Sequence, residues 1–292
     1  MNIEHIVISG GGPVGLSQFG SYKFLIDNNY IEQSKIKSIY ATSVGCFIAI
    51  MIALNMNLND MKEYIIERPW EKTFEVKPST AIYNIINYKG IFNNDFFKKI
   101  IEPVLSSKKI DLNITFDEFY KLTNIDIHFI TSEVNSLSSE NLCYKNNPEL
   151  KIIDALHMSC SIPLLITPYN SDNKYYIDGG LTNNYPLNLC INEYNIENTD
   201  CILGFKNMND IEFIKSLNFN SSLSDVFSTV IRKFSFMIHD KSDINIKHCL
   251  NIYTKGVNVS NMSSLLNKET RKKLVNDGVV YTRLFLEYHN LI

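Results

Sequence analysis

A serine stands between two apolar segments of the chain, in the pentapeptide Ala41-Thr42-Ser43-Val44-Gly45. The residues before it favour a strand, and the apolar run 46–54 after it favours a helix. A strand, a sharp turn and a helix in this order would expose the Ser43 hydroxyl at the top of a sheet, as in the nucleophile elbow of serine hydrolases. The usual elbow has glycine where this chain has Ala41. The alternative is that Ser43 only caps the following helix.

A glycine-rich turn precedes the serine motif. Gly10, Gly11, Gly12 and Gly15 follow a predicted strand at 5–9 and precede apolar residues at helical spacing. The spacing G-x-G-x-x-G also fits a dinucleotide-binding turn, but that fold requires an acid at the end of the second strand, where this chain has the serine motif. Glycines also allow backbone amides to converge on one point, so we expect an oxyanion hole here. The predicted donors are the amides of Gly11 and Gly12.

Two further residues bear on this oxyanion hole. Pro13 lacks an N–H group, so it cannot donate a hydrogen bond. Val44 follows the serine directly and would supply a third amide. The glycine turn and the serine turn would therefore have to lie side by side.

A carboxylate follows another short strand-like run, at Tyr175–Ile177. Asp178 is followed there by Gly179 and Gly180. Alone, this pattern is typical of an ordinary turn. Together with the serine and the glycine turn, it indicates a base for Ser43.

The four motifs in their order, G-G-G-P-V-G, A-T-S-V-G, A-L-H-M-S-C-S-I-P (155–163) and D-G-G-L-T-N-N-Y-P, resemble the signature of the patatin-like phospholipases over about residues 3–205. The resemblance implies a three-layer α/β/α fold with a mostly parallel sheet and a catalytic Ser/Asp dyad. Carried over by motif, Ser43 is the nucleophile, Asp178 is the base and residues 10–15 form the oxyanion loop. The chain departs from the family at Val14, which is often basic, and at Ala41.

The function implied by this resemblance is a lipid acyl hydrolase of the phospholipase A or lysophospholipase type. It would cleave a lipid ester at a membrane or micelle surface through a Ser43 acyl-enzyme, without a metal or another cofactor. An aspartate has an ordinary pKa of about 3.9, so the pocket would have to raise the pKa of Asp178 by desolvation, or the oxyanion hole would have to do most of the work.

Three alternatives stay open. A Ser-His-Asp esterase would recruit a histidine downstream of Asp178, of which there are three: His239, His248 and His289. A catalytically inactive lipid- or protein-binding relative would be consistent with Ala41 and Val14. A nucleotide-binding protein would use the glycine turn for phosphates.

Composition excludes some classes of partner. The 292 residues carry a formal net charge of -3 and are 45% hydrophobic, so the chain can bury a sizeable core and has no electrostatic reason to bind nucleic acid. No run near the elbow approaches the roughly 20 apolar residues of a transmembrane helix, and no secretory signal is visible. We therefore expect a cytoplasmic enzyme that associates peripherally with membranes. Its six widely spaced cysteines favour reduced, buried thiols.

Alternation of strand and helix patterns predicts one parallel sheet covered on both faces. We expect a catalytic domain at 3–205 and an extension at 206–292 packed on the same domain. Thr115 begins a capping box, so a helix should start there. The segment 69–92 has no clear period, which favours a packed surface loop over a lid or an acyl-chain wall. The remaining expected strands are at 36–41, 125–131 and 201–205. Helices are expected at 59–67, at 224–240 packed on the sheet rather than on a membrane, and at 267–289 with an interruption or a bend near Gly278.

Overall fold

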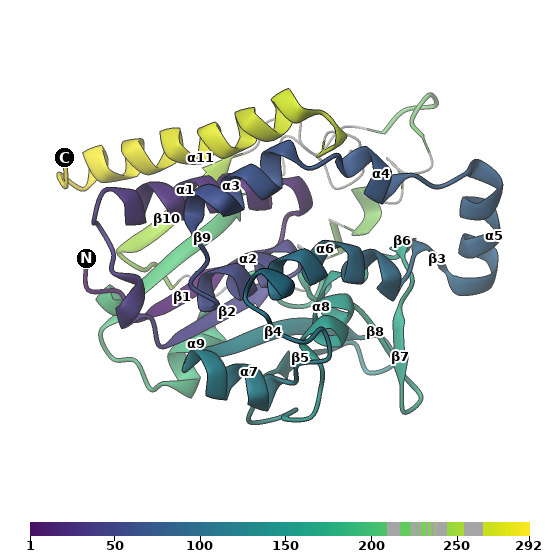
Figure 1. Ribbon diagram of the computed structural model, residues 1–292, viewed down its shortest axis with the longest axis horizontal. Coiled ribbons are helices and arrows are strands. Elements are labelled where there is room, and N and C mark those ends of the chain that lie inside the picture. The colour runs from purple at the N-terminus through teal and green to yellow at the C-terminus, as the bar shows by residue number, and fades with distance from the viewer. Residues whose placement is uncertain are drawn as a thin grey trace.

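The computed structural model describes residues 1–208, 217–222, 226, 229–231, 233, 234, 237, 244–253 and 265–292. These residues form a central eight-stranded sheet with the order β10-β9-β1-β2-β4-β8-β7, and β5 pairs with β4 (Figure 1). Its strands are β1 (His5–Ile8), β2 (Ser38–Thr42), β4 (Asp126–Glu133), β5 (Ser138–Leu142), β7 (Tyr169–Ser171), β8 (Lys174–Asp178), β9 (Ile202–Met208) and β10 (His248–Tyr253).

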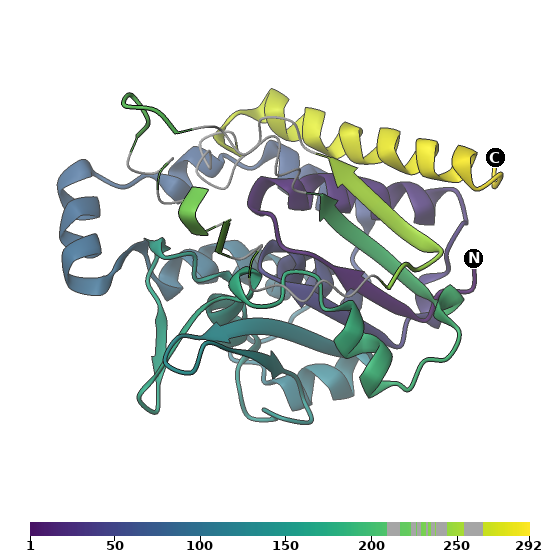
Figure 2. The same cartoon turned by 180° about the vertical axis from the view of Figure 1, so that it is seen from behind.

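The sheet is mixed but mostly parallel. The neighbours β10, β9, β1, β2 and β4 all run in the same direction, whereas β5, β7 and β8 make antiparallel pairs (Figure 2). The predicted α/β class with a mostly parallel sheet flanked by helices is therefore confirmed. The direction of β8 could not be predicted, because the residue pattern of a short strand is the same whether it pairs parallel or antiparallel.

Two clusters of buried side chains cover the two faces of the sheet. The larger one includes Ile6 and Ile8 of β1, and the smaller one takes the intervening Val7, as the two-residue period of a strand requires. The larger cluster packs under α1 (Gly15–Asp27), α2 (Val44–Ala53), α3 (Leu58–Glu67), α6 (Asn94–Ser107), α8 (Ile152–Cys160) and α11 (Lys268–Tyr288). The smaller one packs under α9 (Leu187–Glu193).

The last helix, α11, lies along α1 (Figure 1). The sequence predicted an interruption or a bend near Gly278, but α11 runs without interruption from Lys268 to Tyr288, so the predicted interruption is wrong. A Cβ atom at Gly278 would lie 2.0 Å from the carbonyl oxygen of Ser17, so the glycine permits close helix contact rather than a bend. The hydroxyls of Ser17 and Ser21 donate to the carbonyls of Leu274 (2.8 Å) and Gly278 (3.0 Å) across this contact.

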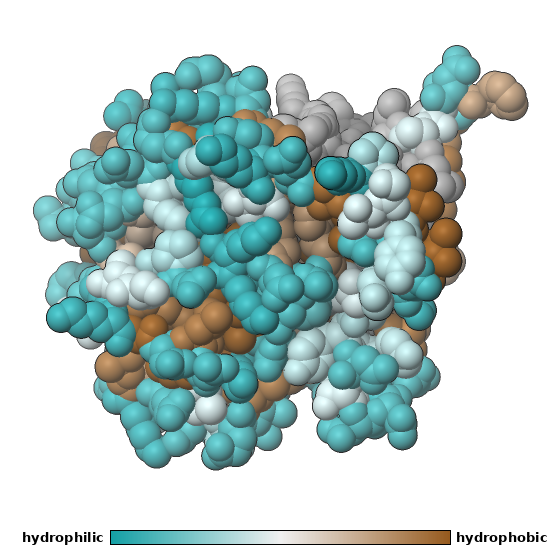
Figure 3. All heavy atoms as spheres, turned by 45° about the vertical axis from the view of Figure 1, so that its right-hand side comes forward, coloured by the Kyte–Doolittle hydropathy of each residue, from teal (hydrophilic) through white to brown (hydrophobic). Residues whose placement is uncertain are grey.

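The segment 69–92 is helical rather than a surface loop, which corrects the sequence expectation. It contains α4 (Trp70–Phe74), α5 (Pro78–Tyr88) and β3 (Gly90–Phe92), and β3 pairs with β6 (Leu164–Ile166). The ring of Phe74 packs against the rings of Trp70, Phe92 and Phe96, so these aromatic residues form one cluster. Figure 3 turns the α5 end of the molecule forward and shows apolar side chains at its surface.

Other expected elements have different outcomes. The capping box at Thr115 is present and begins α7 (Phe116–Thr123), as predicted. Most of the predicted helix at 224–240 lies outside the described residues. Among the residues that the structure describes, no helix is both long enough and apolar enough to cross a membrane.

A buried charge network lies at the beginning of β4. The His128 ring stacks on Tyr40 at 3.9 Å between centroids, and its Nε2 atom lies 3.0 Å from the Asp126 carboxylate. Burial alone would lower the pKa of His128, but its hydrogen bond to Asp126 raises it to about 9. Lys145 forms a second ion pair with Asp126, at 3.0 Å. His128 is therefore a charged structural residue within the sheet.

Candidate active site

The turn between β2 and α2 holds Ser43 in a conformation that side chains rarely adopt. Its φ is 55° and its ψ is -128°, as expected for the strained turn of a nucleophile elbow. Gly45 is required beside it, because a Cβ atom there would lie 2.9 Å from the carbonyl oxygen of Ile8. The Ser43 side chain makes no cap hydrogen bond to α2, so its role is not that of an ordinary helix cap.

Alanine replaces the first glycine of the elbow pattern without disturbing the turn. Ala41 is fully buried in β2, where it lies between Ile8 of β1 and Phe129 of β4. Its methyl group belongs to the larger core cluster. The departure from the usual pattern is therefore accommodated by packing.

The carboxylate of Asp178 meets Ser43 at the end of β8. The Ser43 hydroxyl donates to Asp178 Oδ2 at 2.6 Å, and the Gly180 amide donates to Oδ1 at 2.7 Å. The backbone of Asp178 is fixed as well, since its amide donates to the Ser161 carbonyl at 3.0 Å. Gly179 is needed here, because a Cβ atom would lie 2.1 Å from the carbonyl oxygen of Ile130.

Burial changes the acidity of this carboxylate. Desolvation raises the pKa of Asp178 from 3.8 to about 6, although the hydrogen bonds from Ser43 and Gly180 act in the opposite direction. An aspartate with this pKa is ionised at neutral pH and is a stronger base than an exposed one. The pair Ser43–Asp178 thus has the geometry and the protonation state needed for base-assisted attack by serine.

The glycine turn lies directly against Ser43. A Cβ atom at Gly10 would lie 3.0 Å from Ser43 Cβ, and one at Gly15 would lie 2.5 Å from a Val44 methyl group. Gly12 has a φ of 55°, which favours glycine. Pro13 and Val14 are buried, so the position that is often basic in the family carries an apolar core residue here.

The amides of this turn divide into two groups. Those of Gly10 and Gly15 are engaged, because Gly10 donates to the Asn184 carbonyl at 3.2 Å and Gly15 donates within the turn. Within the described part of the chain, the amides of Gly11, Gly12 and Val44 donate no hydrogen bond. Gly12 begins a short 3-10 turn and Val44 begins α2, and the first N–H of such an element has no internal partner. Free amides beside a serine hydroxyl are the groups that an oxyanion requires.

Sequence reasoning assigned no role to the residues that support these turns. Ser159 accepts a hydrogen bond from the Ser43 amide at 2.9 Å and donates to the Ile130 carbonyl at 2.6 Å. It thereby connects the elbow to β4. The side-chain amide of Asn207 lies 3.4 Å from the Gly10 carbonyl and supports the glycine turn. Ser159 lies within a quoted motif, whereas no local pattern marks Asn207.

Among the described residues, no histidine is hydrogen-bonded to Ser43 or Asp178. The side chain of His5 pairs with Ser38, and that of His157 with the Thr167 carbonyl. Two of the proposed triad histidines, His248 and His289, lie on β10 and directly after α11. The third, His239, lies outside the described residues.

The six cysteines are all free. Cys46 and Cys160 are close to the elbow, and burial raises the pKa of both thiols, so they are neutral. Among the described residues, no group of three or more His, Cys, Asp and Glu side chains is arranged to hold a metal ion.

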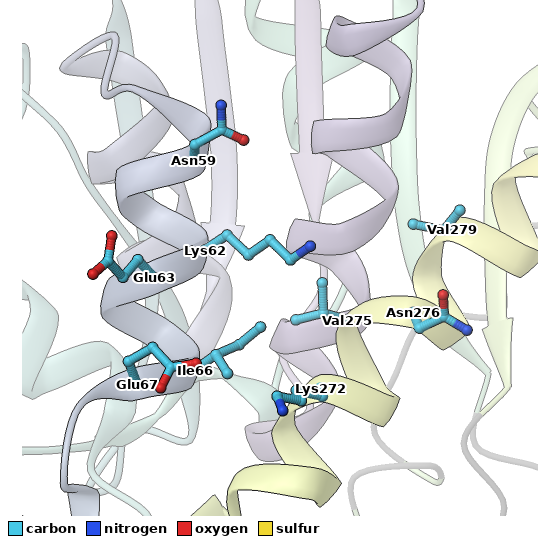
Figure 4. A pocket seen from close by; sticks show the side chains of 9 residues that line it. All are labelled: Asn59, Lys62, Glu63, Ile66, Glu67, Lys272, Val275, Asn276 and Val279. Carbon is cyan, nitrogen blue, oxygen red and sulfur yellow. The ribbon is translucent and has the colours of Figure 1, made fainter.

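A groove of about 680 Å³ lies elsewhere, between α3 and α11 (Figure 4). Lys62 reaches across it toward Val275, and Glu63, Glu67 and Lys272 add charges of both signs. Neither Ser43 nor Asp178 lines this groove.

Comparison with known proteins agrees with this geometry. The model of the family described as patatin-like phospholipase matches residues 6–191. An uncharacterized protein of Acanthamoeba polyphaga mimivirus is 30% identical over 64% of this chain and 61% of its own length. A probable lipid hydrolase of Invertebrate iridescent virus 6 is 24% identical over 66% of this chain and 65% of its own. The matches thus span less than two thirds of these relatives.

A solved structure shares the fold. VipD from Legionella pneumophila superposes with a TM-score of 0.57 at 17% identity, over 99% of this chain and 67% of that one. The family match includes the glycine turn, the serine elbow and the Asp178 turn together. The chain belongs to the patatin-like phospholipase family.

Proposed function

We propose that this protein is a lipid acyl hydrolase of the phospholipase A or lysophospholipase type. The observation that carries the proposal is the 2.6 Å hydrogen bond from the Ser43 hydroxyl to the buried Asp178 carboxylate. The family match and the relative named a probable lipid hydrolase support a lipid ester as the substrate. The substrate would be presented at a membrane or micelle surface.

The proposed acylation step follows from this pair. Asp178 takes the Ser43 proton as the oxygen attacks the ester carbonyl, and the resulting oxyanion accepts hydrogen bonds from the amides of Gly11, Gly12 and Val44. Collapse of this intermediate breaks the ester bond and forms the acyl-enzyme. The leaving alcohol receives the proton from Asp178, so the carboxylate is regenerated.

Deacylation would use the same groups. Water loses a proton to Asp178 as it attacks the acyl carbonyl, and the same amides stabilise the second oxyanion. Ser43 then leaves with the proton, and the fatty acid is released. A dyad suffices because the raised pKa of Asp178 gives it the basicity that a histidine otherwise supplies.

The test is covalent labelling combined with hydrolysis. A fluorophosphonate probe should label the wild type, and Ser43→Ala should abolish both labelling and the hydrolysis of phospholipid and soluble esters. Ser106→Ala, at an exposed serine of α6, is the matched control and should behave as the wild type. Labelling that persists in Ser43→Ala would refute the assignment. A wild type that is neither labelled nor active would favour the catalytically inactive relative.

A further inference from the structure

Helix α5 presents an apolar strip to solvent. None of its residues is buried, and the exposed fraction is 60% for Ile82, 56% for Tyr83, 71% for Ile86 and 53% for Tyr88. Ile82 and Ile86 lie one helical turn apart with Tyr83 beside them, so their side chains form one continuous surface. Exposed apolar surface of this kind marks a contact site.

The attachment of α5 directs this strip away from the core. Asn84 donates to the Ile91 carbonyl at 2.9 Å, and the helix ends at Tyr88 and is followed by Lys89, which has a φ of 65°. The chain then enters β3, where a Cβ atom at Gly90 would lie 2.2 Å from the Thr167 amide. Figures 1 and 2 both show α5 standing apart from the rest of the chain, at the end opposite both termini.

A short series of contacts connects α5 to the catalytic pair. Strand β3, which follows α5, pairs with β6, and β6 comes directly after the segment that contains Ser161. The carbonyl of Ser161 accepts the amide of Asp178 at 3.0 Å. Leu164, at the start of β6, is exposed and has a φ of 67°. The apolar strip is therefore joined to the catalytic turn through one pair of short strands.

The charges around the strip favour one kind of partner. The segment 76–92 contains Lys77 and Lys89, one at each end of α5, and no Asp or Glu, although the whole chain has a net charge of -3. Lysines at this position complement anionic headgroups. Tyrosine rings with a polar hydroxyl, such as those of Tyr83 and Tyr88, suit the boundary between headgroups and acyl chains.

We propose that α5 docks this protein on an anionic lipid surface. Ile82, Tyr83 and Ile86 insert beneath the headgroups, while Lys77 and Lys89 remain at headgroup level. The inference rests on the proposed function, since a lipid ester at such a surface is the substrate that docking would bring to Ser43. Because only two lysines contribute, binding should persist at moderate salt.

The test measures binding to vesicles separately from hydrolysis. The full chain carrying Ser43→Ala is sedimented with vesicles of phosphatidylcholine, with or without phosphatidylserine, so that lipid is not consumed. The test variant adds Ile82→Asp and Ile86→Asp. The control adds Val280→Asp and Leu284→Asp on α11, which have the same spacing and exposed fractions of 46% and 56%.

The α5 variant should bind anionic vesicles at least about 30-fold more weakly than its parent. Each isoleucine that becomes buried in lipid on binding contributes on the order of tenfold to the affinity. The α11 control should stay within about twofold of its parent. The double substitution Lys77→Gln and Lys89→Gln should lower the affinity for anionic vesicles roughly tenfold and should change the affinity for neutral vesicles little. Because all these positions are exposed, the urea midpoints should match that of the parent.

Equal vesicle binding by the α5 variant and the parent would overturn the proposal. So would a parent that is dimeric by light scattering and becomes monomeric in the α5 variant, because a second copy of the chain would then cover the strip. Failure of the proposed function has a different signature: vesicles are bound by the wild type, but neither lipid nor soluble ester is hydrolysed.

Discussion

The buried carboxylate of Asp178, the proposed base, should lower the stability of the fold. The folded protein raises the pKa of Asp178 from 3.8 to about 6, so between these pH values the folded state binds a proton that the unfolded chain has released. The contribution of Asp178 to the free energy of unfolding is therefore fully present below pH 3.8, decreases as the pH rises to about 6, and stays low above that pH. Replacing Asp178 with asparagine removes the cost.

The size of the effect follows from the same two pKa values. The cost is about 1 to 2 kcal/mol at pH 5 and about 3 kcal/mol at pH 8. Asp178→Asn also rearranges hydrogen bonds to Ser43 and Gly180, but that contribution does not depend on pH. The diagnostic quantity is thus the change in relative stability with pH: the variant should gain roughly 1 to 2 kcal/mol on the wild type between pH 5 and pH 8.

The assay is urea unfolding of both proteins at the two pH values, combined with hydrolysis of a soluble ester. Wild-type activity should rise with a midpoint near pH 6, and Asp178→Asn should lose at least about 10²-fold of it. Asp126→Asn is the contrasting control. Burial alone would raise the pKa of Asp126, but His128 and Lys145 outweigh burial and lower this pKa, so the charged carboxylate stabilises the fold. Asp126→Asn should therefore be destabilised at both pH values. A stability difference for Asp178→Asn that does not change between pH 5 and 8 would refute the argument.

Two further predictions test the supports of the site. Gly12→Val places a branched side chain at a φ of 55° and should lower kcat for a soluble ester at least about 10²-fold with little change in KM; a kcat close to wild type would exclude this amide as an oxyanion donor. Gly278→Ala introduces a Cβ atom 2.0 Å from the Ser17 carbonyl and should lower the free energy of unfolding in urea by roughly 2 kcal/mol or more; an unchanged midpoint would contradict close contact between α1 and α11.

The local motifs were readable from the sequence because their chemistry depends on neighbouring residues. The strained turn at Ser43 and the glycines around it are consecutive in the chain, and each sits where a strand pattern ends. The position of Asp178 beside Ser43 was different. The motif alone fits any turn, and only the family resemblance connected it to the serine.

Long-range supports and unusual helices could not be predicted. Asn207 reaches Gly10 from 197 positions away, which no local pattern encodes. Helix α5 was missed although Ile82 and Ile86 have helical spacing, because its apolar strip faces solvent and no residue of the helix is buried against the core. The interruption expected near Gly278 is absent because this glycine makes room for the neighbouring helix α1 and does not end α11.

The contact between α1 and α11 also bears on how the chain folds during its synthesis. Helix α1 begins at the glycine turn, yet its partner carbonyls at Leu274 and Gly278 come 257 positions later in each pair. Domains form as the chain emerges from the ribosome, and pairings between distant residues are slow to form. The glycine turn thus gains its full support only after the chain has been synthesised as far as Gly278. Under the proposed function, a nascent chain would carry Ser43 long before it could hydrolyse a lipid ester.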